Sequence, residues 1–296
     1  MNTTPGHFIT GEELDRGQLE ALLDRAAELK AGRDAGLGEN SLARRSIALI
    51  FELPSTRTRV SFEVGVAELG AHPVVLSGSA LQLSRGESVS DTARVLSSYV
   101  SGIVIRSRDD ADVVALAEAS EVPVVNALTA EHHPCQALAD LLTLRERFGS
   151  LDGLRVAFIG DGNNVARSLA TLGRTAGLQV AVASPDGYEL EEGLCELCRD
   201  PREAVAGAVA VYTDVWASMG DESDAENRNR DFEGFQLDAE LMAAAHDDAV
   251  ALHCLPAHPG QEISEEVLYG ESSAVWDQAE NRLHTQKALL ELLIDA

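Results

Sequence analysis

Short apolar runs alternate with amphipathic helical patterns along most of this chain, and that alternation limits its fold more than any other feature. A strand followed by a helix, repeated many times, is typical of a parallel sheet covered by helices, because parallel neighbours need a crossover connection. In the first half, strands are expected at residues 46–51, 73–76, 103–105 and 122–125, and helices at about 11–30, 58–69, 91–100, 111–119 and 134–148.

A second series of the same kind follows. It begins with a strand at residues 154–159, which leads through Gly160 and Gly162 into a helix that ends near residue 176. Further strands are expected at 180–183, 209–213, 249–252 and 274–276, and a last helix at about 279–294. The sequence therefore predicts an α/β protein of two domains, residues 1–150 and 151–296, each a mainly parallel sheet flanked by helices. The last helix is long enough to pack back across both domains.

The composition is that of a globular protein. With 296 residues, of which 45% are hydrophobic, each half can bury a core of ordinary size. No apolar run approaches the ~20 residues that span a bilayer, and the first residues lack the basic and apolar pattern of a leader. We therefore expect a cytoplasmic protein that has no membrane partner.

The four cysteines are too few for a disulfide framework in a chain of this length. Cys195 and Cys198 form one CxxC pair, which lacks the second pair or the histidines of a zinc site. Together with Leu194 and Leu197, their spacing suits the buried face of a helix. We therefore expect no metal and no redox role for them.

The net charge of −26 is extreme, and only two of the 23 basic residues, Lys30 and Lys287, are lysines. The acidic residues are dispersed, and the chain has no basic stripe, which argues against a nucleic-acid partner. Dispersed carboxylates resemble the surfaces of proteins from halophiles, in which accumulated salt screens the repulsion between like charges.

The run Ser-Thr-Arg-Thr-Arg at residues 55–59 lies where a predicted strand gives way to a helix. The first N–H groups of a helix have no intrahelical partner and carry partial positive charge, so they attract anions. Two arginines and three hydroxyl groups at this place favour a phosphate ligand. The alternative is an ordinary N-cap, in which one Ser or Thr side chain closes the end of the helix.

Other polar residues lie at the ends of predicted strands, where ligands bind in open α/β sheets, or near the start of the last helix. These residues are Arg106, His133, Gln136, Asp214, Cys254 and Arg282. The arginines suit a phosphate, although each could instead pair with a carboxylate. His133 could polarise a carbonyl, or could simply precede a helix that begins at Pro134. Asp214 could bind an amine, and Cys254 offers either a thiol or a small apolar side chain.

Together these motifs resemble those of the aspartate and ornithine carbamoyltransferases, over nearly the whole chain. The run at 55–59 and the segment His-Pro-Cys-Gln at 133–136 resemble the carbamoyl phosphate signatures of both branches. The segments Asp-Val-Trp-Ala-Ser-Met-Gly at 214–220 and His-Cys-Leu-Pro at 253–256 resemble the ornithine branch. The resemblance implies two α/β domains that close on one another, the first for carbamoyl phosphate and the second for ornithine, and a transfer that needs no metal or organic cofactor.

Carried over residue by residue, the resemblance implies two binding sets and a catalytic set. Carbamoyl phosphate would be held by Ser55, Thr56, Arg57, Thr58, Gln82, Arg106, His133, Pro134, Cys135, Gln136, Cys254, Leu255 and Arg282. Ornithine would be held by Asn164, Asp214, Ser218 and Met219, while Arg57, His133, Asp214 and Cys254 would act in catalysis. In the family, the residue that corresponds to Gln82 lies on a loop that reaches a neighbouring subunit, which implies a homotrimer or a multiple of trimers.

One position departs from the family pattern, since Pro259 stands where members commonly have an arginine. Three other interpretations stay open. A carbamoyltransferase for another amine, such as putrescine, is disfavoured by Ser218 and Met219. A nicotinamide-dependent dehydrogenase would need a third glycine where Val165 stands. A non-catalytic protein of the same fold would have no need of the retained Arg57.

The dispersed negative charge predicts that folding stability depends on salt. Screening weakens the repulsion between carboxylates, with a Debye length of ~3 Å at 1 M salt, so we expect the melting temperature to rise between low and molar KCl. Thermal unfolding followed by circular dichroism measures this rise. A melting temperature that stays flat over the same range contradicts the interpretation of the surface as salt-adapted.

Overall fold

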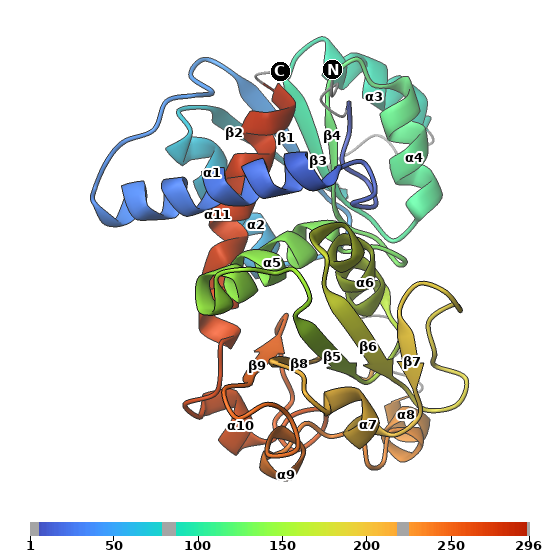
Figure 1. The fold of residues 1–296 in the computed structure, drawn as a ribbon. Helices are drawn as coiled ribbons and strands as arrows, with labels where there is room; N and C mark the ends of the chain where they lie inside the picture. The colour runs from blue at the N-terminus through green and yellow to red at the C-terminus, as the bar shows by residue number, and fades with distance from the viewer. Residues whose placement is uncertain (1–5, 79–86, 218–224, 295–296) are drawn as a thin grey trace. The chain divides into compact units, whose positions relative to one another are not determined.

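The computed structural model describes residues 6–78, 87–217 and 225–294, and the chain divides into two compact units (Figure 1). The first unit holds Met1–Ala139 together with Asn281–Ala296, and the second holds Asp140–Glu280. Helix α5 (Pro134–Phe148) passes from the first unit into the second, and α11 (Val275–Ile294) returns from the second to the first. The expected last helix that leads back to the first half of the chain is thereby confirmed.

The first unit is built on a four-stranded parallel sheet in the order β2-β1-β3-β4. Its strands are β1 (Ser46–Phe51), β2 (His72–Ser77), β3 (Gly102–Arg106) and β4 (Val124–Leu128). Its helices, besides parts of α5 and α11, are α1 (Arg16–Asp34), α2 (Thr56–Glu68), α3 (Val89–Ser97) and α4 (Asp110–Ala119). The central strands β1 and β3 are almost wholly buried, which is why they read as unbroken apolar runs.

Helices α3 and α4 share a core with one face of this sheet. Alternate residues of the central strands point to that face, as the period of a strand requires. The strand residues are Ala48, Ile50, Ile103 and Ile105, and the helix residues include Ala93, Val113 and Leu116. The side chains of Ser88 and Asp109 cap the two helices. Each accepts a hydrogen bond from an N–H group in the first turn, which favours the start of a helix at that residue.

The second unit holds a five-stranded parallel sheet in the order β7-β6-β5-β8-β9. Its strands are β5 (Arg155–Ile159), β6 (Gln179–Ala183), β7 (Glu196–Cys198), β8 (Ala210–Thr213) and β9 (Val250–His253). Its helices, besides parts of α5 and α11, are α6 (Asn164–Ala176), α7 (Pro201–Val205), α8 (Ala225–Asp231), α9 (Ala239–Met242) and α10 (Glu265–Tyr269). From β5 the chain adds β6 and β7 on one side and then β8 and β9 on the other, so the strand order reverses between β5 and β8.

Two expectations about the second unit are wrong. Residue 275 starts helix α11, and the strand expected at 274–276 is replaced by an isolated bridge between Ser273 and Ala251. Cys198 ends strand β7, which pairs with β6, so the CxxC pair does not lie on a helix. In both places, pairing with a strand that is distant in sequence decides the backbone conformation, and local spacing does not report such pairing.

The fold class expected from the sequence is confirmed, since both units are parallel sheets with helices around them (Figure 1). Within the described residues, no helix is both long enough and apolar enough to cross a bilayer.

Charged side chains tie α11 to α1 and α2 within the first unit. Lys30 Nζ donates to Asn281 Oδ1 at 2.8 Å, and Lys287 Nζ donates to Glu68 Oε2 at 2.9 Å. His284 is buried on the same helix. Burial lowers the pKa of His284 to about 4, and the positive charges of Lys287, Lys30 and Arg33 add to that effect against the opposing charge of Glu68.

This buried histidine predicts a pH-dependent stability. In the unfolded chain His284 regains its ordinary pKa of 6.5, so between pH 6.5 and 4 the unfolded state binds more protons than the folded state. The free energy of unfolding therefore falls as the pH decreases through this window, by up to about 1.4 kcal/mol per pH unit for one group. We expect His284→Gln to reduce this slope, as measured by urea unfolding between pH 7 and 4.5.

The control is His72→Gln, because His72 is exposed at the start of β2. It should leave the slope as it is in the wild type. An equal slope for His284→Gln and the wild type would show that the buried ring does not contribute.

Candidate active site

The run at residues 55–59, for which the sequence predicts a phosphate ligand, lies at the start of α2, shortly after the end of β1. Ser55 is the N-cap residue, and its side-chain oxygen accepts a hydrogen bond from the Thr58 N–H at 3.2 Å. A capped helix start still presents its other first N–H groups and its positive dipole end to a ligand, so the cap and the anion site are compatible. Thr56 and Arg57 are exposed in this first turn. The order of the sheet reverses between β1 and β3, which is where ligands bind in such sheets.

An arginine from near the end of the chain joins this site. Arg282 donates from Nη1 to Gln136 Oε1 at 2.7 Å and from Nη2 to Thr58 Oγ1 at 3.4 Å. In the amide orientation that satisfies its neighbours, Gln286 accepts from Arg282 Nε at 3.2 Å and donates to Ser61 Oγ at 2.7 Å. These bonds hold the buried guanidinium between the first turns of α2 and α5.

His133 is buried just before α5, beside three arginines. Burial lowers the pKa of His133 well below its ordinary value of 6.5, and the charges of Arg282, Arg106 and Arg57 lower it further. The imidazole is therefore neutral at pH 7. A neutral ring still has one N–H to donate to an oxygen, and it adds no charge to a cluster of arginines.

The other residues predicted for the first unit lie near these groups or outside the described ranges. Arg106 is buried at the end of β3, and Pro134 is the first residue of α5. Burial raises the pKa of Cys135 to about 12, and its thiol donates to the Asn126 carbonyl oxygen at 3.3 Å. Cys135 is therefore a packed, protonated thiol. Gln82 lies outside the described residues.

Arg59 differs from its neighbours in the same run. Its Nε donates to Glu63 Oε1 at 2.6 Å, four residues further along α2, and 57% of its side chain is exposed. Such a pair is an ordinary contact on the surface of a helix. Arg59 therefore pairs with a carboxylate of its own helix.

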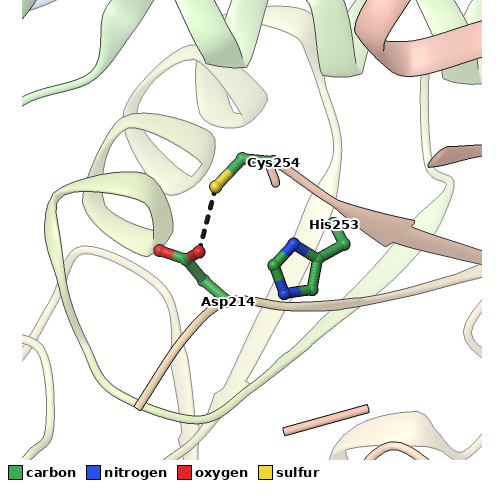
Figure 2. Close-up of side chains that lie close together, drawn as sticks. All are labelled: Asp214, His253 and Cys254. Atoms are coloured by element: carbon green, nitrogen blue, oxygen red, sulfur yellow. Dashed lines mark hydrogen bonds between the residues drawn. The ribbon is translucent and has the colours of Figure 1, made fainter. Parts of the chain in front are cut away.

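In the second unit, Asp214 and Cys254 are neighbours because two parallel strands end together. Strands β8 and β9 pair with Thr213 opposite His253, so the next residue of each strand leaves the sheet at the same edge. The Cys254 thiol donates to Asp214 Oδ1, with an Sγ–O distance of 3.0 Å (Figure 2). Asp214 is 7% exposed, so its carboxylate depends largely on protein donors.

The ring of His253 lies beside this pair (Figure 2). Its two hydrogen bonds hold it in one tautomer. Its Nδ1 accepts from the Leu255 N–H at 2.9 Å, so Nε2 carries the proton and donates to Glu262 Oε1 at 3.2 Å. His253 and Glu262 are both fully buried. The ring thereby fixes the backbone on both sides of Cys254, including Leu255, whose φ of 59° is rare for a non-glycine residue.

Helix α6 brings an amide to the same carboxylate. Asn163 is the N-cap residue of α6, and its Nδ2 donates to Asp214 Oδ2 at 2.8 Å. A thiol and an amide therefore donate to the two oxygens of Asp214. Asn164, which is predicted to bind ornithine, is the first residue of α6, whereas Ser218 and Met219 lie outside the described residues.

The side chains of Asp214, His253 and Cys254 are also the types that bind zinc, and one potential ligand atom of each lies within 4.8 Å of the others. For His253 to bind a metal, its ring would have to give up one of its two hydrogen bonds. In the structure, Asp214 and Cys254 are hydrogen-bonded to each other, whereas the His253 ring is hydrogen-bonded to Leu255 and Glu262. A carboxylate beside a thiol can accept a hydrogen bond and a proton from an amine, and this chemistry needs no metal.

Comparison with known proteins assigns the chain to a family. Residues 6–146 match the model of the aspartate/ornithine carbamoyltransferase, carbamoyl-P binding domain, and residues 152–293 match that of the Asp/Orn binding domain. The chain belongs to the aspartate/ornithine carbamoyltransferase family.

Relatives within this family extend over nearly the whole chain. The ornithine carbamoyltransferase of Acidothermus cellulolyticus is 53% identical and covers 98% of this chain and 97% of its own length. That of Symbiobacterium thermophilum is 49% identical, with 99% and 100% covered. The solved structure of the ornithine carbamoyltransferase from Pyrococcus furiosus matches with a TM-score of 0.95 and 44% identity, over 99% of this chain and 98% of that one.

In this member of the carbamoyltransferase family, reasoning from the sequence missed several supporting residues. Asn163 carried a signal, because an asparagine directly before a helical pattern is an N-cap candidate. His253 lies in the segment at 253–256, but the sequence points to the thiol of Cys254 as the reactive group and gives the histidine no role. Glu262 and Gln286 carried no signal, because what they do depends on partners that only the folded chain brings to them.

Two arginines of the first unit provide a matched test of the anion site. We expect Arg106→Gln to weaken binding of inorganic phosphate about tenfold or more, because a buried guanidinium is lost. Arg59→Gln should leave the affinity within about twofold, since Arg59 is paired with Glu63 on the surface. Isothermal titration calorimetry measures both affinities, with circular dichroism as the check that each variant folds.

Arg106→Gln has a second readout. Arg106 is one of the charges that lower the pKa of His133, so this pKa should rise in the variant when it is followed by NMR titration. Equal losses of phosphate affinity for the Arg106 and Arg59 variants would contradict the assignment of Arg106 to the site.

Proposed function

We propose that this chain is an ornithine carbamoyltransferase, which transfers the carbamoyl group of carbamoyl phosphate to the side-chain amine of L-ornithine and yields L-citrulline and phosphate. The observation that carries the proposal is the hydrogen-bonded pair of Asp214 and Cys254 at the ends of adjacent strands. Support comes from relatives named ornithine carbamoyltransferase that are 53% and 49% identical over almost the whole chain.

In this proposal, residues 1–150 form the carbamoyl phosphate-binding domain. The hydroxyl groups and the uncapped N–H groups of residues 55–58 hold the phosphate at the start of α2, and Arg57 and Arg106 balance its charge. The neutral ring of His133 donates to the carbamoyl oxygen, together with Thr58, where negative charge develops as the bond to nitrogen forms. Arg282 completes the pocket in the orientation that Gln136 fixes.

Residues 151–296 form the proposed ornithine-binding domain, and its last helix, at about 279–294, crosses back to the first domain. Asn164, Asp214, Ser218 and Met219 hold the amino acid, and Cys254 with Leu255 also borders the carbamoyl phosphate. The neutral amine attacks the carbamoyl carbon, a C–N bond forms, and the bond from that carbon to the phosphate oxygen breaks with its electron pair on phosphate. The Asp214 and Cys254 pair orients the amine and assists the loss of its proton.

The proposal extends to assembly and setting. The family resemblance favours a homotrimer or a multiple of trimers, in which the Gln82 loop reaches a neighbouring site. The proposed setting is arginine metabolism in the cytoplasm. The net charge of −26 favours a cell that accumulates salt in its cytoplasm. Neither a metal nor an organic cofactor has a role in this scheme.

A citrulline assay in both directions at molar salt tests the proposed reaction. Ornithine's side-chain amine has a pKa near ~10, so the rate should rise from neutral towards alkaline pH. Arg57→Ala should lower kcat/KM by ~10²-fold or more, because the phosphate loses a charged donor in the transition state, while Arg59→Gln serves as the matched control.

The outcomes separate the alternatives. Full activity in Arg57→Ala would overturn the phosphate assignment, and a flat pH profile would contradict the proton-loss step. Carbamoylation of putrescine in place of ornithine would assign the chain to a different acceptor.

A further inference from the structure

The side chain of Asn163 performs two tasks at once. Its Oδ1 accepts hydrogen bonds from the N–H groups of Val165 at 3.0 Å and Ala166 at 3.2 Å, which caps helix α6. Its Nδ2 donates to Asp214 Oδ2 at 2.8 Å. Because the two helix N–H groups require an acceptor, the amide oxygen must face the helix, and the amide nitrogen therefore faces the carboxylate.

Asp214 is held from two directions as a result. One oxygen accepts from the amide of Asn163 and the other from the thiol of Cys254 at 3.0 Å. Two donors, one on each oxygen, remove the freedom of this carboxylate to rotate. A rotation of this group would break both hydrogen bonds together.

The backbone before Asn163 is also fixed. The N–H of Gly162 donates to the Tyr188 carbonyl oxygen at 2.7 Å, and a Cβ at Gly162 would lie 2.6 Å from the Leu190 nitrogen. Only glycine permits this approach of two backbone segments. Asn163 thus stands on a backbone that has little room to move, which suits a residue that orients another.

We propose that Asn163 is a positioning residue for the reaction, which acts through Asp214 and sets how that carboxylate presents itself to the thiol of Cys254 and to the amine of the acceptor. This inference rests on the proposed function and deepens it. Because Asn163 acts through its hydrogen bond to Asp214, its effect should appear in kcat and in pH dependence rather than in the affinity for carbamoyl phosphate.

Asn163→Asp is the decisive variant. Aspartate caps a helix as well as asparagine does, and it has nearly the same size, but it places a carboxylate oxygen opposite Asp214 where a donor had been. We expect a melting temperature close to that of the wild type and an unchanged KM for carbamoyl phosphate. In contrast, kcat should fall by ~10²-fold, and the pH profile should shift towards alkaline values, because two adjacent carboxylates share a proton.

A second readout does not depend on the reaction. Alkylation of Cys254 by iodoacetamide, followed by mass spectrometry across pH, reports how readily its thiol ionises. The added negative charge in Asn163→Asp should move this alkylation profile to higher pH. If the wild type forms no citrulline, the proposed function fails, whereas the alkylation profile still decides whether Asn163 controls the Asp214 and Cys254 pair.

The control and the contrary results are as follows. Asp238→Ala removes the cap of α9 in the same unit, and should lower the melting temperature without changing kcat or the alkylation profile. A folded Asn163→Asp variant with wild-type kcat and an unchanged alkylation profile would mean that Asn163 only caps its helix, and would overturn the proposal. If Asn163→Asp does not fold, Asn163→Ser replaces it, since serine caps the helix but is too short to reach Asp214. Wild-type activity in that variant would overturn the proposal equally, and a loss of kcat at an unchanged melting temperature would support it.

Discussion

The candidate site depends on one constraint, namely that parallel strands place their carboxyl ends at the same edge of a sheet. In the first unit, the strand order reverses between β1 and β3. The run at 55–59 follows β1, and Arg106 is the last residue of β3. In the second unit the order reverses between β5 and β8, which are followed by Asn163 and Asp214, and β9 adds Cys254. The two units therefore use one geometric arrangement at the ends of their strands.

The arginines of the first unit differ in burial, and burial decides how each one is used. In a chain of net charge −26, surface arginines such as Arg59 pair with nearby carboxylates, whereas Arg106 and Arg282 are buried, and Arg282 is held by Gln136 and Thr58. Their charges act more strongly where water is excluded. Burial lowers the pKa of His133, and the arginine charges lower it further, because a proton on its ring would add a positive charge to the cluster. The result is a neutral ring, able to donate a hydrogen bond, beside a cluster of permanently charged arginines.

How much of the fold could be predicted depended on how local the deciding forces were. Strand β1 and helix α5 have the bounds that the sequence predicts, because an unbroken apolar run and a proline at the first helical position are local signals. The strand expected at 274–276 and the helix around Cys198 were wrong, because pairing with Ala251 and with β6 decided those segments. Arg106, Asp214 and Cys254 could be named as candidates from the sequence because they lie at or just beyond strand ends, whereas His133 lies just before α5.

The sequence by itself determined the fold class, the strand ends at which chemistry is expected and the family to which the motifs belong, since each of these depends on residues that are close together in the chain. Only the tertiary structure decided which side chains meet. Arg282 contacts Gln136 across 146 residues, and Asn163 contacts Asp214 across 51. Such contacts are set by strand register and by helix packing, which depend on the whole fold. A local sequence pattern therefore cannot predict that the Asn163 amide and the Cys254 thiol donate to the two oxygens of Asp214.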